Sequence, residues 1–162
     1  MLGVGELLIW RLDKKSRAAT WDSGEGARLY GGRWNHKGRT IVYCAVDPAT
    51  AIIEVAVHKG FSELDTIPHM LTCALIRDPK TVHVVHPNMV PNPNWLIPGK
   101  PSDGQQKFGD ALLTAHPFIL IPSTVSTHSW NLCFDPAFAK TLYSLKFQEA
   151  FALDTRLNPP PP

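Results

Sequence analysis

Residues 30–58 read YGGRWNHKGRTIVYCAVDPATAIIEVAVH, which predicts a loop, a strand and a helix in direct succession. Thr40–Val46 is β-branched and apolar and therefore indicates a strand. Asp47 and Pro48 suit the N-cap and the first position of a helix, and Gly60 suits its end. This strand and helix decide the fold, because an apolar helix has to be buried against a sheet that contains the strand.

The remainder of the chain predicts more strands than helices. A capping box at Ser102–Gln105 predicts a helix to about Ala115, and Asp135 with Pro136 predicts a short one. Residues 13–38 are polar and glycine-rich and are expected to form a long loop. Apolar runs indicate strands at Leu7–Leu12, Leu71–Ile76, Val82–Val85, Phe118–Pro122, Trp130–Phe134 and around Phe147–Leu153. Because strands and helices do not alternate regularly, we predict an α+β fold rather than a doubly wound one.

The composition is that of one globular domain. The chain has 162 residues, 44% of them hydrophobic and 19% charged, which excludes a disordered protein. The net charge is only +2, and the basic residues are scattered instead of forming the stripe typical of nucleic-acid binders. We therefore expect no direct contact with nucleic acid. The domain is expected to span residues 1–157, followed by a proline-rich extended tail over residues 158–162.

Cysteines, histidines and missing motifs exclude further classes. Cys44, Cys73 and Cys133 lie in apolar runs, which favours reduced, buried thiols and a cytoplasmic location. His83 and His86 are three residues apart in an expected strand and point to opposite faces, so we expect no metal site. The chain contains no P-loop, no dinucleotide-binding GxGxxG after a strand, and no nucleophile elbow. Its N-terminal stretch resembles neither a signal peptide nor a membrane span.

The helix after Asp47 carries one carboxylate among apolar residues. Because apolar side chains cover nearly its whole circumference, we expect this helix to be buried. Glu54 in its middle then needs a partner or a purpose, either as half of a structural ion pair or as the wall of an active site. His58 lies one turn further on the same face and either contacts Glu54 or interacts with the helix C-terminus.

Three other residues are candidates whose role their sequence context leaves open. Arg33 follows two glycines, so it either belongs to a tight turn or faces an anionic ligand. Tyr43 interrupts an aliphatic strand and is either a packing residue with a bonded hydroxyl or a ligand contact. Ser123 follows a proline at the end of a strand, which by itself indicates a turn serine.

Together these residues match a known pattern. The stretch from Gly24 to His58, with its GGRWN, VYCA strand and single helical glutamate, resembles the RES domain, as does the later Pro-Ser pair. The Arg, Glu and Ser that give the family its name correspond to Arg33, Glu54 and Ser123. The strand tyrosine of the family corresponds to Tyr43. WNLCFDPAF keeps Asn131 of a later family segment but lacks the histidine that follows there.

The resemblance implies a fold, an activity and a partner. RES domains are the toxins of RES–Xre type II toxin–antitoxin systems, with an ADP-ribosyltransferase-like mixed sheet flanked by helices. They degrade NAD+ by hydrolysis or by phosphorolysis, and some members instead ADP-ribosylate a protein. The resemblance thus implies NAD+ as substrate, inorganic phosphate as a co-substrate in phosphorolysis, and no separate cofactor. It also implies an Xre-type helix-turn-helix antitoxin, and it is compatible with a homodimer.

The residues suit this chemistry in the following roles. Cleavage of the nicotinamide–ribose bond develops an oxocarbenium-like cation, which the Glu54 carboxylate is expected to stabilise. Arg33 is expected to bind phosphate oxygens, and Tyr43 to contact the nicotinamide or a ribose hydroxyl. Ser123 either orients Glu54 or binds substrate. Gly32 and Asn35 complete the expected substrate-binding loop, where Gly32 permits close approach and Asn35 chiefly holds the loop's shape.

Overall fold

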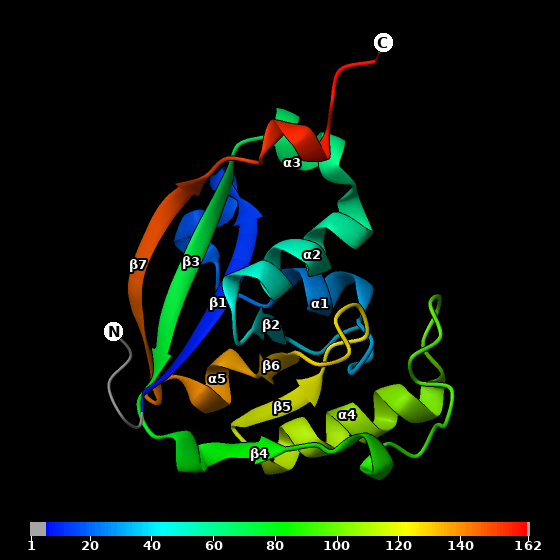
Figure 1. Cartoon of the computed structure of the whole chain (residues 1–162). Helices are drawn as coiled ribbons and strands as arrows, with labels where there is room; N and C mark the ends of the chain where they lie inside the picture. The colour runs from blue at the N-terminus through cyan, green and yellow to red at the C-terminus, as the bar shows by residue number, and fades with distance from the viewer. Residues whose placement is uncertain (1–5, 162) are drawn as a thin grey trace.

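The computed structural model describes residues 6–161, and seven strands of this part of the chain form one mixed sheet (Figure 1). The order across the sheet is β4-β5-β6-β2-β1-β3-β7. Only the pair β4–β5 is parallel among these neighbours. The strands are β1 (Leu7–Lys14), β2 (Val42–Ala45), β3 (His69–Ile76), β4 (Val82–Val84), β5 (Phe118–Pro122), β6 (Trp130–Phe134) and β7 (Tyr143–Phe151). The predicted α+β class is confirmed.

Three of the helices described below begin where the sequence places their caps. The Asp47 carboxylate accepts from the backbone N–H of Thr50, and Gly60 ends the same helix with a φ of 79°. The Asp135 and Ser102 side chains cap two others in the same way. The helices are α1 (Glu25–Tyr30), α2 (Pro48–Lys59), α3 (Phe61–Thr66), α4 (Asp103–Ala115) and α5 (Pro136–Ala139), with short 3₁₀ turns at Lys15–Thr20, Pro79–Thr81, Pro87–Met89 and Thr155–Leu157.

Side chains of the central strands alternate between two apolar layers. On β2, Val42 and Cys44 pack into the layer that also contains Phe118 and Phe134. Tyr43 points to the opposite face, where it packs with residues such as Ile41, Trp34 and Leu113. On that second face α2 packs against β1 and α4 against β5, as Figure 1 shows. Tyr43 on β2 and Asn131 on β6 therefore lie on the face of the sheet that α2 and α4 cover.

Several expectations about the elements are wrong. Residues 13–38 are not a loop throughout, because β1 extends to Lys14 and a 3₁₀ turn and α1 follow it. The helix α2 is not buried all round: Ile53 and Val57 are 37% and 61% exposed, while Ala51 and Thr50 are buried. The inner face of α2 packs on β1 and α3, whereas no element among residues 6–161 covers Ile53 and Val57. The last strand also begins four residues earlier than predicted, at Tyr143.

The ends of the chain and the cysteines complete the description. Residues 1–5 and 162, and with them the first residues of the predicted domain and the last residue of the predicted tail, lie outside the described residues. Asn158 is still tied to α3, because its Nδ2 donates to Asp65 at 2.9 Å. The chain beyond it, over residues 159–161, has no helix or strand and extends away from the body of the molecule (Figure 1). Cys44, Cys73 and Cys133 are buried and unpaired, and burial raises the pKa of Cys44 to about 12. No helix between residues 6 and 161 is long and apolar enough to cross a membrane.

Candidate active site

The Glu54 carboxylate is held by two donors that lie on a different part of the sheet. Ser123 Oγ donates to Glu54 Oε1 at 2.7 Å, and Asn131 Nδ2 donates to the same oxygen at 2.5 Å. Ser123 follows directly on β5 and Asn131 belongs to β6, so the two strands reach the middle of α2 together. Oε2 of Glu54 has no hydrogen-bond partner among residues 6–161. One carboxylate oxygen is thus fixed by two donors, and the other is unpaired within the described residues.

Ser123 is itself fixed by the loop that it begins. Its side chain is fully buried, and Oγ accepts from the backbone N–H groups of Val125 at 3.1 Å and Ser126 at 2.9 Å. These two donors leave the hydroxyl hydrogen free to point at Glu54. The end of the same loop is tied to α2, because Ser129 Oγ donates to the Asp47 carboxylate at 2.8 Å. The loop is therefore joined to α2 both at the helix start and at Glu54.

Asp47 connects the helix cap to this loop. Its carboxylate accepts from Thr50 Oγ1 as well as from Ser129, and the Thr50 and Ser129 hydroxyls lie 2.6 Å apart. Desolvation raises the pKa of Asp47, but hydrogen bonds from Thr50 and Ser129 outweigh it and leave the pKa lowered. A cap that the sequence predicted for local reasons also positions the segment that carries Ser123.

The Tyr43 hydroxyl is engaged by the loop that precedes its strand. It donates to Asn35 Oδ1 at 2.6 Å and accepts from the Trp34 backbone N–H at 3.2 Å. Burial raises the pKa of Tyr43 well above its ordinary value, so the phenol stays neutral. Gly32 lies so close that a Cβ there would approach the Tyr43 hydroxyl to 2.5 Å and Asn35 Oδ1 to 2.7 Å. Gly32 therefore makes room for this hydrogen bond.

Asn35 organises the loop of residues 31–39. It is fully buried, and its amide nitrogen lies within hydrogen-bond distance of the carbonyls of Ala27, His36 and Arg39. Its backbone carbonyl accepts from Gly32 N–H, and Gly31 adopts a φ of 72°. In this structure Asn35 serves the loop and the Tyr43 hydroxyl, while its expected contact with substrate stays a prediction.

The same loop is docked on α4. Gln106 Nε2 donates to the carbonyls of Gly32 and Asn35, at 2.8 and 3.0 Å. Gly109, one turn further, packs directly against the backbone of Trp34, where any Cβ would clash. A glycine inside α4 thus lets the helix approach the loop closely, although glycine is unfavourable inside helices. The segment that carries Arg33 is held by rigid elements.

Arg33 lies beside a pocket, with much of its guanidinium unpaired. Its Nη1 donates to the carbonyl of Trp95 at 2.8 Å, which is its one hydrogen bond within residues 6–161. Burial lowers the pKa of Arg33, and the charge of Glu54 and the phenol of Tyr43 act in the opposite direction. Arg33 stays charged, and within the described residues the remaining N–H groups of its guanidinium have no acceptor.

The structure brings most of the predicted residues together on one face. Glu54 and Ser123 are in direct contact, and Tyr43 lies on the same face of the sheet as Asn131. Arg33 makes no hydrogen bond to Glu54 within the described residues, and the Glu54 charge only partly offsets the lowering of the Arg33 pKa by burial. His58 is exposed at the end of α2 and has no hydrogen bond to Glu54.

Asn131 is the residue to which the sequence assigned no role. The signal that the sequence offered was one asparagine in an otherwise apolar strand. Its partnership with Glu54 spans 77 residues and required the fold.

Arg11 is a further residue that the sequence did not single out. Its guanidinium pairs with Asp13 at 2.6 Å and donates to the Tyr43 carbonyl at 2.7 Å. It thereby bridges β1 and β2, whose pairing is limited to Trp10 and Ala45. Between residues 6 and 161 no group of three His, Cys, Asp or Glu side chains is arranged to hold a metal ion.

Comparisons with known proteins agree with this arrangement. The model of the RES domain family matches residues 8–154. "Toxin Res" of Yersinia enterocolitica is 30% identical over 158 residues, which cover 94% of this chain and 100% of that protein. "Prs ADP-ribosylating toxin" of a Sphingobium species is 45% identical over 52 residues, 31% of this chain and 32% of that protein.

A solved structure shares the fold at low sequence identity. One chain of the M. tuberculosis MbcT–MbcA toxin–antitoxin complex superposes with a TM-score of 0.72 and 20% identity, covering 91% of this chain and 85% of that one. The family match spans both the Glu54 carboxylate with its two donors and the Arg33 loop. This chain is a member of the RES domain family.

Proposed function

We propose that the chain is the toxin of a toxin–antitoxin pair and that it cleaves the nicotinamide–ribose bond of NAD+. The observation that carries this proposal is the Glu54 carboxylate, with Oε1 fixed by Ser123 and Asn131 and Oε2 left unpaired. A carboxylate that neutral donors hold in one orientation suits a developing cation better than a carboxylate in a structural ion pair does. The membership of the RES family and the relative called "Toxin Res" support the role of toxin.

The chemistry needs little beyond electrostatic stabilisation and positioning. The C1′–N bond breaks, its electron pair leaves with nicotinamide as a neutral molecule, and C1′ becomes oxocarbenium-like. Water or phosphate then supplies an oxygen to C1′ and releases a proton to solvent. The products are nicotinamide with ADP-ribose or with ADP-ribose 1-phosphate. Because the leaving group departs neutral, one carboxylate suffices and no acid near Glu54 is required.

The other residues have roles that follow from their positions. Arg33 pairs with phosphate oxygens of the dinucleotide, and Tyr43 contacts the nicotinamide ring or a ribose hydroxyl with its ring, since its hydroxyl is already engaged. Ser123 and Asn131 hold Glu54 instead of contacting substrate. Gly32 and Asn35 keep the loop in the shape that presents Arg33.

A second candidate is transfer of ADP-ribose to a protein. It is favoured by the 45% identity over 52 residues to the Sphingobium protein that is called an ADP-ribosylating toxin. The same site serves both reactions, which differ in whether water, phosphate or a protein side chain attacks C1′. A cognate antitoxin, of the Xre type in our proposal, would bind the toxin in the cytoplasm, and the similarity in fold to a chain of a toxin–antitoxin complex supports such a partner.

Product identification distinguishes these reactions. The purified protein is incubated with NAD+ in three conditions: without inorganic phosphate, with inorganic phosphate, and with lysate protein as acceptor. The products are separated by chromatography and identified by mass spectrometry. Free ADP-ribose indicates hydrolysis, ADP-ribose 1-phosphate indicates phosphorolysis, and modified protein with little free ADP-ribose indicates transfer. Intact NAD+ in all three conditions, including with lysate protein as acceptor, contradicts the proposed function.

A further inference from the structure

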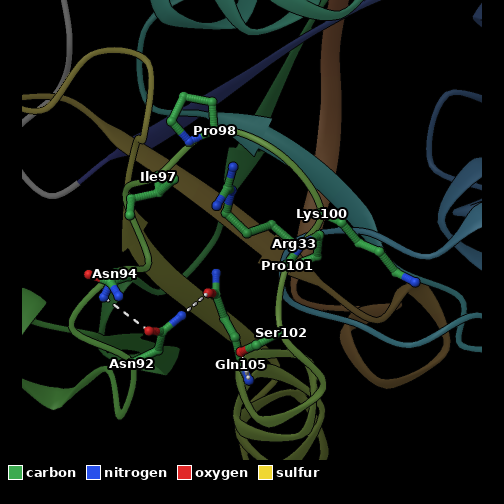
Figure 2. A pocket seen from close by; sticks show the side chains of 9 residues that line it. All are labelled: Arg33, Asn92, Asn94, Ile97, Pro98, Lys100, Pro101, Ser102 and Gln105. Carbon is green, nitrogen blue, oxygen red and sulfur yellow. Dashed lines mark hydrogen bonds between the residues drawn. The ribbon is translucent and has the colours of Figure 1, made fainter.

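A pocket of about 290 Å³ lies between the Arg33 loop, the chain of residues 92–101 and the start of α4 (Figure 2). This volume is on the order of ten times that of a water molecule in the liquid. It is at the lower limit of sites for small molecules, so the pocket accommodates one part of a dinucleotide. The residues that bring charge or hydrogen-bonding groups to it are Arg33, Asn92, Asn94, Lys100, Ser102 and Gln105.

Gln105 has an amide group with an unused donor. The sequence pattern predicts that this glutamine folds back onto the backbone N–H of Ser102 to complete a capping box. The Ser102 half of the box is formed, with Oγ accepting from Gln105 N–H at 3.2 Å, but the glutamine half is not. The Gln105 side chain turns instead into the pocket, where it is 1% exposed and its Nε2 has no partner among residues 6–161.

A chain of hydrogen bonds fixes which end of that amide faces the pocket. The backbone N–H of Asn94 can only donate, and it takes Asn92 Oδ1 as acceptor at 3.0 Å. Asn92 therefore presents its amide nitrogen to Gln105 and donates to Oε1 at 3.3 Å. Gln105 is left with Nε2 directed toward the pocket, as Figure 2 shows. A buried donor held without an acceptor is costly, which indicates that a ligand supplies one.

The charge around this donor selects the class of ligand. Arg33 lines the pocket with unpaired N–H groups, and Ser102 places the positive end of the 13-residue helix α4 there. Lys100 lines the rim, although its ammonium group points outward in Figure 2. Two carboxylates oppose this positive charge. Asp103, next to Ser102, is paired with His36 and Lys107, and the charge of Glu54 acts to raise the pKa of Arg33.

We propose that this pocket binds a phosphate group through Arg33, Gln105 Nε2 and the N-terminal end of α4. A tetrahedral oxyanion has acceptor oxygens in several directions, which suits donors that reach one pocket from different elements. Two sources share this chemistry: the diphosphate of NAD+ and free inorganic phosphate as co-substrate. The assignment of either source to this pocket rests on the proposed function, whereas the proposal that the pocket binds an anion does not.

Titration calorimetry with inorganic phosphate and with inorganic pyrophosphate, at constant ionic strength set by chloride, tests the site without any turnover. We expect saturable binding of at least one probe by the wild type. Gln105→Glu places a carboxylate beside Arg33 in place of the ligand and is expected to weaken binding about 10-fold or more. Asn94→Asp, an exposed change at the rim, is expected to weaken it several-fold, and the exposed Asn88→Asp outside the pocket is expected to leave it unchanged.

The outcomes separate this site from the proposed function. Binding of neither probe by the wild type, or equal binding by Gln105→Glu, Asn94→Asp and Asn88→Asp, overturns the phosphate site even if NAD+ is cleaved. Binding that depends on Gln105 and Asn94 supports the site even if NAD+ stays intact. If NAD+ is cleaved, an Asn94→Asp variant with a raised KM for NAD+ assigns the pocket to the diphosphate. A raised KM for phosphate alone assigns it to the co-substrate.

Discussion

The hydroxyl of Ser123 donates a 2.7 Å hydrogen bond to Oε1 of Glu54, which lies 69 residues earlier in the chain. Two backbone N–H groups of its own loop orient that hydroxyl, and Asn131 donates to the same carboxylate oxygen. The carboxylate is thus held in one orientation by groups on two strands. In an active site such positioning contributes to the rate, because the stabilising charge is in place before the reaction begins.

Replacing Ser123 with alanine is expected to lower kcat more than it changes KM. A hydrogen bond to a charged group contributes about 1.5–3 kcal/mol, so we expect kcat to fall roughly 10- to 100-fold. Nicotinamide release measured at several NAD+ concentrations gives both parameters. Ser126→Ala, in the same loop and with no hydrogen bond from its side chain within residues 6–161, is the matched control. Equal kcat values for the two variants would refute the positioning role of Ser123.

Gly32→Ala is expected to destabilise the protein. The new Cβ would lie 2.5 Å from the Tyr43 hydroxyl, so the loop or the tyrosine must shift. Overpacking of this kind costs about 1–3 kcal/mol. Gly26→Ala in α1 meets no atom within 4 Å and is expected to be neutral or slightly stabilising, because alanine favours helix. Urea unfolding of both variants measures the difference, and equal stability shows that the close approach at Gly32 does not matter.

Tyr43→Phe separates the hydroxyl from the ring. Loss of the hydroxyl leaves Asn35 Oδ1 and the Trp34 N–H without their partner, which is expected to cost about 1–3 kcal/mol of unfolding free energy. Because the ring remains, the KM for NAD+ is expected to change by less than about 3-fold, whereas Tyr43→Leu raises it further. Unfolding curves and steady-state kinetics check this. A large rise in KM for Tyr43→Phe would indicate that the hydroxyl contacts substrate.

The docking of the Arg33 loop on α4 is expected to depend on pH. Hydrogen bonds to Asp110 and then to Asp103 raise the pKa of His36, against a smaller effect of burial. Because the pKa of His36 is higher in the folded protein, the charged imidazole stabilises the fold. This contribution is complete below the unfolded-state pKa of about 6.5 and is lost as the pH rises through the higher folded-state pKa. The Tm difference between wild type and His36→Gln should therefore be largest near pH 5.5 and shrink toward pH 8.5, where a constant difference would disprove the ionic contribution.

Local patterns predicted much of the fold. Asp47 and Ser102 cap helices because their side chains bond to backbone groups three residues away, which is visible in the sequence. The apolar pattern of α2 was misleading, because hydropathy does not tell which neighbour covers a surface, and Ile53 and Val57 are exposed. The helix α1 was not predicted, because it follows Gly24, contains Gly26 and has no buried side chain among its six residues.

The sequence predicted single residues of the candidate site, but not the contacts between them. Glu54 was singled out as the one carboxylate of an apolar helix, and Ser123 was identified from the resemblance. Asn131 joins them through strand pairing that no local pattern encodes. Gln105 was read as part of a capping box, which explains its backbone contact and not its side chain. The contact of Arg33 with the Trp95 carbonyl spans 62 residues and likewise emerges only from the folded chain.

Release of nicotinamide from NAD+ by Glu54→Gln, compared with wild type, is the most direct test of the proposed reaction. Glutamine keeps the size of the side chain and removes its charge, so we expect the rate to fall about 10²- to 10³-fold or more while the Tm stays close to that of the wild type. Glu149→Gln, an exposed position on β7, is the matched control and should retain full activity. A folded Glu54→Gln protein that releases nicotinamide at the wild-type rate would show that the Glu54 charge does not drive the reaction.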